Sequence, residues 1–245
     1  MSEELLLWIG CTSSYRVPEL ASSFMYTLRA LKVDFKYLGS NEGCCGSILL
    51  RLGLKKEFSE VAKKTLSLIC STEARKLVTH CPGCLRAFKI DYPLQLGMAI
   101  DLAIQHSTQL ILDHIEPSIL KPLEIKAVYF DPCHLGRHMN IYEPPRRLLS
   151  MIPGLRLIEL VESREASLCC GAGGGVRACF EELALAVAQE LLERVKLMGA
   201  EALITACPFC YHNFKMVSNG FPKVLDITQV IQASIEGSLH ESLGR

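Results

Sequence analysis

Ten of the 12 cysteines in the sequence fall into two sets that share one internal pattern. Each set contains a lone cysteine, then a Cys-Cys-Gly triplet, then a Cys-Pro-x-Cys motif. The first set comprises Cys11, Cys44, Cys45, Cys81 and Cys84, and the second comprises Cys133, Cys169, Cys170, Cys207 and Cys210. In a reducing compartment, cysteines in this number indicate metal ligation or redox chemistry rather than structural disulfides.

The spacing of the two sets indicates an internal duplication. The lone cysteines are 122 residues apart, the Cys-Cys-Gly triplets 125 and the Cys-Pro-x-Cys motifs 126. The repeat continues beyond the cysteines, because residues 108–111 (TQLI) resemble residues 228–231 (TQVI). We therefore predict two related domains, residues 1–120 and 121–245, joined near residues 117–122, where two prolines suit a linker.

Short apolar strands are the elements that must position these cysteines. In each half, a first strand ends before the lone cysteine, a second precedes the triplet, and a third runs into Cys-Pro-x-Cys. The predicted strands are residues 5–9, 34–38 and 76–79 in the first half, and 127–130, 155–160 and 202–205 in the second. Apolar runs of this length are typical of strands buried in parallel sheets.

Helical periodicity occupies the segments between these strands. The predicted helices cover residues 20–31, 58–69, 145–151 and 181–198, the last with an apolar stripe at Leu183, Val187, Leu191 and Val195. A further helix with proline in its first turn is expected after each third strand. This alternation predicts an α/β fold of two duplicated Rossmann-like domains, each a mostly parallel sheet flanked by helices. Such sheets bind ligands where strands end and helices begin, which is where all ten cysteines fall.

The local setting of each motif suits thiolate ligands. A Cys-x-x-Cys at the start of a helix directs two sulfurs to one site, and the free N–H groups there favour the thiolate. Adjacent side chains of a regular strand point to opposite faces. Cys44 and Cys45 therefore reach one centre only if the backbone turns, which Gly46 permits. The glycines in residues 171–175 allow the backbone to approach a bulky inorganic group closely.

Five thiolates exceed the four ligands that zinc or an ordinary cubane cluster takes. A set of five with an adjacent pair indicates an unusual cluster or one exchangeable ligand, and the spacing leaves both open. Structural zinc is the alternative for the same residues. Cys70 and Cys179 stand outside the pattern, within helical segments, and we expect them to be buried as small apolar side chains.

Composition and charge exclude several classes of protein. The chain has 26 Lys and Arg against 26 Asp and Glu, so binding to nucleic acid or to an anionic membrane surface is not expected. No apolar stretch reaches the ~18 residues of a transmembrane helix, and residues 5–9 are too short for a secretion signal. We therefore expect a cytoplasmic protein with no membrane-spanning segment.

The repeated pattern resembles the cysteine-rich CCG domain, a family named after its Cys-Cys-Gly signature. Two complete copies, around Cys44-Cys45-Gly46 and Cys169-Cys170-Gly171, extend the resemblance over nearly the whole chain. The family includes the catalytic B subunit of heterodisulfide reductases. It also includes iron–sulfur subunits of glycolate, lactate and glycerol-3-phosphate oxidation systems and of thiol:fumarate reductases. Complete motifs in both halves favour the reductase B subunit, since many redox relatives lack part of one.

In the heterodisulfide reductase B subunit, each complete motif binds a noncubane 4Fe-4S cluster. The resemblance implies two such clusters here, each held by the five cysteines of one set. The residues expected to take part in catalysis are Cys45, Cys81, Cys170, Cys207 and His134. His134 follows Cys133 and is a candidate proton donor, because thiolate products need protons. The expected reaction reduces a mixed disulfide, such as that of coenzymes M and B in methanogenesis, to two thiols, with the substrate between the two sites.

The chain contains neither the Cys-x-x-Cys-x-x-Cys-x-x-x-Cys-Pro segment of several relatives nor a G-x-G-x-x-G fingerprint. The resemblance therefore implies that electrons come from a small iron–sulfur subunit with two cubane 4Fe-4S clusters, with a flavin-containing subunit behind it. The alternative function is an electron-transfer subunit of a glycolate, lactate or glycerol-3-phosphate dehydrogenase-type complex. A zinc-stabilised interaction module is a third possibility.

Several basic residues are further candidates. Arg137 and His138 are candidates for contact with an anionic substrate group, although exposure to solvent is the simpler expectation. Similar candidates are Arg16, Arg146, Arg147 and Arg177. His80 precedes Cys81, but Ala206 occupies the matching place in the second half, so we expect His80 to be structural.

Overall fold

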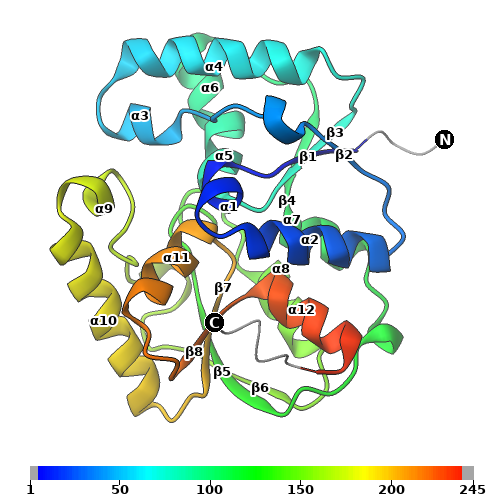
Figure 1. Cartoon of the computed structure of the whole chain (residues 1–245), viewed down its shortest axis with the longest axis vertical. Helices are drawn as coiled ribbons and strands as arrows, with labels where there is room; N and C mark the ends of the chain where they lie inside the picture. Colours follow the sequence, from blue (N-terminus) through cyan, green and yellow to red (C-terminus); the bar gives the residue numbers. More distant parts are fainter. Residues whose placement is uncertain (1–4, 239–245) are drawn as a thin grey trace.

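The computed structural model describes residues 5–238 and contains two four-stranded parallel sheets, one in each half of the chain (Figure 1). The first has the strand order β2-β1-β3-β4 and the second β6-β5-β7-β8, so the two halves share one topology. The strands are β1 (Leu5–Trp8), β2 (Lys36–Tyr37), β3 (Lys76–Thr79), β4 (Ala103–His106), β5 (Ile125–Phe130), β6 (Leu155–Ile158), β7 (Ala202–Thr205) and β8 (Lys223–Asp226). The predicted α/β fold of two repeated Rossmann-like units is confirmed.

Helices connect the strands in both halves. In the first half they are α1 (Cys11–Tyr15), α2 (Pro18–Ala30), α3 (Ser47–Arg51), α4 (Lys55–Cys70), α5 (Pro82–Arg86), α6 (Tyr92–Leu96) and α7 (Ser107–His114). In the second they are α8 (Glu143–Ser150), α9 (Val176–Cys179), α10 (Glu181–Leu197), α11 (Pro208–Val217) and α12 (Ile227–Glu236). A π-helical turn, η2 (Ala87–Asp91), joins α5 to α6, and the 3-10 turns are η1 (Gly39–Asn41), η3 (Pro117–Ile119) and η4 (Arg164–Ala166).

The strands and helices that sequence patterns predict all occur, but each half also has a fourth strand and a last helix that they missed. The fourth strands, β4 and β8, lie at sheet edges, and β4 is only partly buried. Both strands are short and neither has a long apolar run, which is the signal that the prediction used. A capping box starts each following helix, with His106 and Gln109 in α7 and with Asp226 and Gln229 in α12. The domain boundary between residues 120 and 121 stays a prediction, and residues 1–4 and 239–245 of these domains lie outside the described part.

The two halves pack through helices that lie between the sheets. Helix α2 contacts α12, and α7 contacts α8, in the middle of the molecule (Figure 1). One apolar core joins the halves there and includes Phe24, Leu28, Leu110, Leu148 and Ile231. Separate clusters cover the outer faces of the sheets, under α4 and α6 in the first half and under α10 and α11 in the second. Burial of this shared core fixes how the two halves face each other.

Helix α10 differs from its predicted apolar stripe. Leu183 is 57% exposed, whereas Leu191 and Val195 are buried. The buried face is completed by alanines, Ala184 and Ala188, which bring the helix close to its neighbours. Alanine contributes little to a hydrophobic pattern. A prediction from the large side chains therefore placed the start of the buried face at Leu183 instead of at Ala184. Among residues 5–238, no helix combines the length and apolar composition that a membrane span needs.

A buried polar cluster also links the halves. His80, which directly follows β3, reaches across to the second half, where its Nε2 lies 2.8 Å from Asp226 Oδ2. Its Nδ1 lies 2.6 Å from Ser107 Oγ. The other oxygen of Asp226 accepts hydrogen bonds from the backbone N–H and the hydroxyl of Thr228. His80 is thus structural, as expected, and its contact with Asp226 aligns the two halves.

We predict that His80→Ala lowers the free energy of unfolding by about 3 kcal/mol, because Asp226 stays buried without its partner from the other half. The shift of the urea midpoint at constant metal content measures this change. His114→Ala is the control: His114 is exposed and its ring hydrogen-bonds to the carbonyl of Leu110 in its own helix, so a loss below about 1 kcal/mol is expected. Equal losses in both variants would contradict the role of His80.

Candidate metal centre

In each half, the central pair of strands leads into the cysteine motifs. Strands β1 and β3 lie side by side, with Trp8 opposite Thr79, although the chain runs from β1 to one edge of the sheet before it returns to β3. At such a switch point, a crevice opens beyond the carboxyl ends of the strands. Cys11 begins α1 and Cys81 directly precedes α5 at this crevice. Strands β5 and β7 repeat the arrangement in the second half.

The five cysteines of the first set lie together in the wall of one cavity. The Sγ atoms of Cys45 and Cys84 are 3.2 Å apart. The thiols also interact electrostatically in the pairs Cys11–Cys44, Cys44–Cys45 and Cys81–Cys84. The fold therefore brings together sulfurs from three distant stretches of the chain.

The second set forms the same chain of contacts. The thiols interact electrostatically in the pairs Cys133–Cys169, Cys169–Cys170, Cys170–Cys210 and Cys207–Cys210. The order of the contacts matches that of the first set, with the lone cysteine at one end and Cys-Pro-x-Cys at the other. The internal duplication thus extends from the sequence to the geometry of the sulfurs.

All ten of these cysteines line one cavity of about 210 Å³. Its walls come from both halves, so it lies where the two halves face each other. The other lining residues are Thr12, Ser47, Ile48, Arg51, Gly83, Pro132, His134, Gly173, Gly174 and Phe209. In Figure 1 the helices next to the motifs, α1, α3, α5, α9 and α11, gather around the centre and left of the molecule. The two cysteine sets are therefore the facing walls of one site.

A left-handed glycine turns the backbone after each Cys-Cys pair. Gly46 has φ 74° and Gly171 has φ 88°, a backbone conformation that residues other than glycine rarely adopt. The N–H of Gly46 donates to Cys44 Sγ at 3.3 Å, and the N–H of Gly171 donates to Cys169 Sγ at 3.4 Å. The turn that the sequence required of Gly46 is therefore present in both halves, and it aims backbone donors at the sulfurs.

Side chains from the surrounding helices hold the Cys-Cys pairs by their carbonyl groups. Thr65 Oγ1 donates to the carbonyl of Cys44 at 2.8 Å, and the hydroxyl of Tyr92 donates to that of Cys45 at 3.2 Å. In the second half, Asn213 Nδ2 donates to the carbonyl of Cys170 at 2.8 Å. These contacts fix the pairs before any ligand binds and belong to residues that no sequence motif marks.

Crowding of the thiols shifts their pKa values in opposite directions. Hydrogen bonds from Cys44 and then Cys84 lower the pKa of Cys45 to about 6, despite its burial. Hydrogen bonds to Cys45 and Cys81, followed by burial, raise the pKa of Cys84 well above its usual value. Because one thiolate raises the pKa of the next thiol, the five thiols cannot all ionise unless a bound cation compensates the charge.

These donors fit a metal–sulfur cluster. Five thiols line each wall, and thiolates are the ligands that soft metals prefer. Backbone N–H groups point at the sulfurs, and the glycine turn leaves room because it carries no Cβ. Five thiols also exceed the four ligands that a structural zinc ion takes. The arrangement therefore matches a centre with several metal atoms better than it matches one structural zinc ion.

His134 lines the cavity, and its Nδ1 lies 3.3 Å from Cys133 Sγ. Burial, followed by the nearby His138, Arg86 and Arg51, lowers the pKa of His134 to about 4. The imidazole is therefore neutral near pH 7, and its other nitrogen carries the proton when Nδ1 accepts from the thiol of Cys133.

Glu42 is a site residue that the sequence analysis missed. Its carboxylate accepts hydrogen bonds from the backbone N–H groups of Ile9 at 2.9 Å and Gly10 at 2.6 Å, directly before Cys11. Burial raises the pKa of Glu42 to about 7, although these hydrogen bonds oppose the shift. Its place two residues before Cys44 is the only sequence signal, and Ser167 stands there in the second half.

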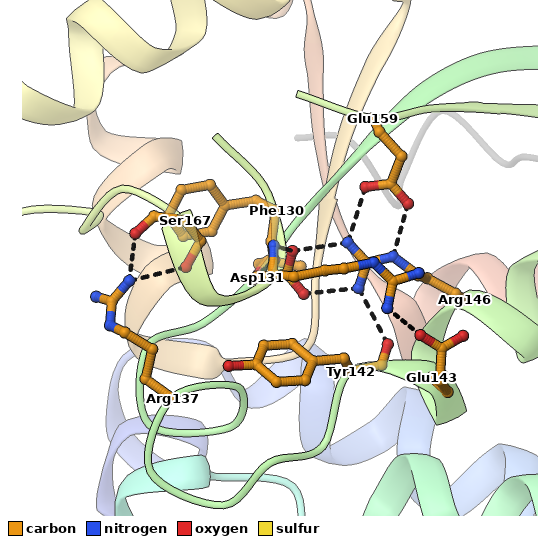
Figure 2. A network of polar contacts seen from close by, with 10 residues as sticks. Phe130, Asp131, Arg137, Tyr142, Glu143, Arg146, Glu159 and Ser167 are labelled. Atoms are coloured by element: carbon orange, nitrogen blue, oxygen red, sulfur yellow. Dashed lines mark hydrogen bonds and ion pairs between the residues drawn. The ribbon is translucent and has the colours of Figure 1, made fainter. Parts of the chain in front are cut away.

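The second half holds its cysteine loops with an arginine network instead (Figure 2). Both terminal nitrogens of Arg146 donate to Asp131 at 2.7 Å, and the guanidinium also pairs with Glu159 at 2.6 Å. Asp131 lies two residues before Cys133. Arg137 donates to the carbonyl and the hydroxyl of Ser167, two residues before Cys169. Arg146 is buried and makes its contacts within the protein, rather than with the solvent or the anion that we considered. Arg137 is exposed to solvent, which was the simpler expectation, and it also holds Ser167.

The two cysteines outside the pattern do not follow their prediction. Cys70 and Cys179 are both exposed. Each is the last residue of its helix, α4 or α9, so it lies beyond the face that the helix buries. The expectation of buried, apolar packing for these two residues was wrong.

The cysteine-rich domain family, CCG, matches the chain twice, over residues 5–89 and 127–215. The D subunit of the dihydromethanophenazine:CoB–CoM heterodisulfide reductase of Methanosarcina acetivorans is 36% identical over 233 residues, which are 93% of this chain and 57% of that protein. The probable iron–sulfur-binding oxidoreductase FadF of Bacillus subtilis is 30% identical over 248 residues, 96% of this chain and 34% of that protein. The chain spans about half the length of the first of these relatives, which is a D subunit rather than the B subunit that we expected.

One solved structure shares the fold. A hypothetical protein from Helicobacter pylori superposes with a TM-score of 0.67 at 14% sequence identity, over 96% of this chain and 49% of that one. At this identity the likeness supports the arrangement of two α/β units and says nothing about chemistry.

We predict that Gly46→Ala lowers the free energy of unfolding by about 2 kcal/mol, because a side chain in the left-handed region is strained. Its Cβ would also lie 2.9 Å from Phe58 Cδ2. The same strain displaces Cys44 and Cys45, so the bound metal per chain should fall with stability. Denaturation and metal analysis measure the two effects.

The matched control is Gly173→Ala, also in a glycine turn that lines the cavity. An added Cβ there meets nothing within 4 Å, and no left-handed φ opposes it. Stability should change by less than about 0.5 kcal/mol. A metal content that falls equally in both variants would contradict the role of the turn at Gly46.

Proposed function

The chain belongs to the cysteine-rich CCG domain family, and from this premise we propose that it is the iron–sulfur subunit that reduces a disulfide in a heterodisulfide-reductase-type complex. The observation that carries the proposal is the single cavity that all ten motif cysteines line. A subunit that only relays electrons has no need to open two cysteine sets onto one shared space.

Each set of five cysteines would hold one 4Fe-4S cluster. The fifth thiol exceeds the four ligands of a cubane and supports a noncubane type. When bound, such clusters supply electrons one at a time, whereas reduction of a disulfide takes two electrons and two protons and yields two thiols. The cysteine side chains hold the clusters, and the backbone N–H groups of Gly46 and Gly171 stabilise negative charge on sulfur.

The shared cavity has a direct consequence for the substrate. A disulfide bound there would lie between the two cysteine sets. Each of the two proposed clusters could then supply one of the two electrons that its reduction requires. Cys45 and Cys170, the buried members of the adjacent pairs, together with Cys81 and Cys207 from the other motif, line the space where the S–S bond would lie. We assign His134, in the same wall, to relay a proton to one thiolate product, because its neutral ring takes up a proton at one nitrogen while it donates from the other.

The partners and the setting belong to the same proposal. A one-electron donor fits a small iron–sulfur subunit with two cubane clusters, and a flavin-containing subunit behind it would split electron pairs into single electrons. The similarity to one of the subunits of a heterodisulfide reductase supports a complex of this kind, with the B-subunit role and a cytoplasmic location as its finer points. The mixed disulfide of coenzymes M and B is the first substrate to test.

Similarity to the Bacillus subtilis oxidoreductase FadF favours a second candidate function. In it, the chain is an electron-transfer subunit of a dehydrogenase-type complex, and the two cysteine sets are successive relay sites. Turnover of a disulfide with reduced viologen as the electron donor separates the candidates, because a relay subunit reduces no disulfide.

We expect protein purified without oxygen to be brown and to contain about eight iron and eight sulfide per chain, from two clusters of four. Iron and sulfide analysis with Mössbauer spectroscopy measures the number and type of clusters together. Colourless protein with stoichiometric zinc would instead establish a zinc-stabilised module.

We predict that Cys170→Ser lowers viologen-dependent disulfide reduction about 100-fold and halves the iron content. Cys170 joins Cys169 to Cys210, so its loss interrupts one set and leaves the other intact. Cys179→Ser is the control, because Cys179 is exposed outside both sets and should keep the iron and the activity of the wild type. Unchanged turnover in Cys170→Ser would rule out the reductase proposal.

A further inference from the structure

A second cavity, of about 460 Å³, lies next to the first cysteine set, and we call it the Glu42 pocket. Its lining residues come from the loop before α1, from α1 and α2, and from the segment between β2 and the Cys-Cys pair. Within residues 5–238, only Cys11 lines both this pocket and the cavity between the halves. A group in the Glu42 pocket therefore lies next to the first set without entering the shared cavity.

The charge of the pocket comes from one carboxylate. Among the described residues that line it, Glu42 is the only acidic one and none is Lys, Arg or His. The two oxygens of Glu42 accept hydrogen bonds from the backbone N–H groups of Ile9 and Gly10. A carboxylate oxygen accepts more than one hydrogen bond, so both oxygens keep room for a further donor. The pocket thus offers an acidic group and no basic side chain to pair with it.

The other polar groups of the pocket also suit a cation. Tyr15 and Tyr37 line it from α1 and β2 and are 80% and 53% exposed, and the faces of aromatic rings attract cations. Ser13 also lines the pocket, and its Oγ is buried and has no hydrogen-bond partner in the described part of the chain. Such an unpaired buried atom is rare in proteins. A carboxylate, two rings and a free hydroxyl together fit a guanidinium or ammonium group, which carries several N–H donors.

The internal repeat shows a guanidinium at the matching place in the second half. Arg137 matches Tyr15 at the offset of the lone cysteines, 122 residues, and Ser167 matches Glu42 at the offset of the triplets, 125 residues. Arg137 Nη1 donates to the carbonyl of Ser167 and, at 3.1 Å, to its hydroxyl (Figure 2). The second half therefore fills this place with its own arginine. The first half has an exposed tyrosine instead of that arginine, a carboxylate instead of the serine, and an open pocket.

We propose that the Glu42 pocket binds an arginine or lysine side chain of the electron-donating subunit, which docks there against Cys11. This inference rests on the proposed complex and makes the first set the entry point for electrons. Exposed tyrosines are typical anchors of protein interfaces, and the pocket adjoins a cysteine of the first set. The donor gives up one electron and the first centre takes it, with no bond formed or broken. Because the shared cavity stays free, donor and substrate reach the protein at different places.

Butylguanidinium, which carries the cation of an arginine side chain, is the probe for the pocket. Calorimetry with the metal-loaded protein measures its affinity without turnover. We expect it to bind the wild type and to bind Glu42→Gln and Tyr37→Ala about tenfold more weakly, because the charge or a ring is lost. Tyr15→Arg should bind no probe, since its own guanidinium can then reach Glu42 as Arg137 reaches Ser167.

Leu94→Arg is the matched control, because Leu94 is 73% exposed on α6 and lines neither cavity. It adds the same charge as Tyr15→Arg and should keep the affinity of the wild type. Tyr15 is exposed, so its variant tests the pocket even if a change at Glu42 disturbs the loop before Cys11. A wild type that binds no probe, equal affinity in Tyr15→Arg, or an equal loss in Leu94→Arg would overturn the inference.

Stopped-flow reduction of the metal-loaded protein tests the entry of electrons. Reduced methyl viologen is a cation, whereas reduced bis(3-sulfonatopropyl) viologen is an anion, and the ratio of their rate constants measures the preference for a cationic donor. Tyr15→Arg should lower this ratio about tenfold and Leu94→Arg should leave it unchanged. Butylguanidinium should slow reduction by methyl viologen. Binding of the probe without this competition would mark a site for a free organic cation and overturn the docking role.

The cysteine variants test which set receives the electrons. In Cys170→Ser the first set is intact, so Tyr15→Arg should still lower the ratio. In Cys45→Ser the first set is interrupted, and Tyr15→Arg should have no effect. The opposite pattern would overturn entry through the first set.

Disulfide turnover, measured separately, distinguishes this inference from the proposed function. A ratio that falls as expected in protein that reduces no disulfide would support the entry point and overturn the reductase proposal. An unchanged ratio in protein that does reduce disulfides would overturn the entry point and leave the reductase proposal standing.

Discussion

The structure depends on one constraint, that five cysteines from three distant segments line the same wall of one cavity in each half. Neighbouring thiols shift the pKa of one another in opposite directions, so the five cannot all be free thiolates at once. The fold supplies what opposes this repulsion. Adjacent parallel strands bring Cys11 to Cys81, and a left-handed turn at Gly46 directs both members of the pair inward. Without this turn, the pair would point to opposite faces of the chain.

The two halves solve this problem with different residues. In the first, the carboxylate of Glu42 holds the loop before Cys11 through its backbone N–H groups. In the second, Arg146 bridges Asp131 and Glu159 next to Cys133. Duplication thus conserved the placement of sulfur in the chain, while the polar contacts around it diverged. This asymmetry gives the two centres different electrostatic surroundings, which suits two sites that take different roles in one reaction.

The interface between the halves decides the function as much as the motifs do. Each cysteine set is complete within its own half, but the cavity exists only because the two sets face each other. The apolar core between α2, α12, α7 and α8 and the buried pair of His80 and Asp226 hold this arrangement.

The sequence alone determined the duplication, the α/β class, and the grouping of the cysteines at the strand ends, because cysteine spacing and apolar runs are local signals. It missed the edge strands β4 and β8, which lack long apolar runs, and it placed Cys70 and Cys179 in the core although they lie at exposed helix ends. Only the tertiary structure decided which side chains complete the site. Glu42, Asn213 and the partners of Arg51 act across long stretches of chain, and no local pattern encodes a contact that forms only when two halves pack together.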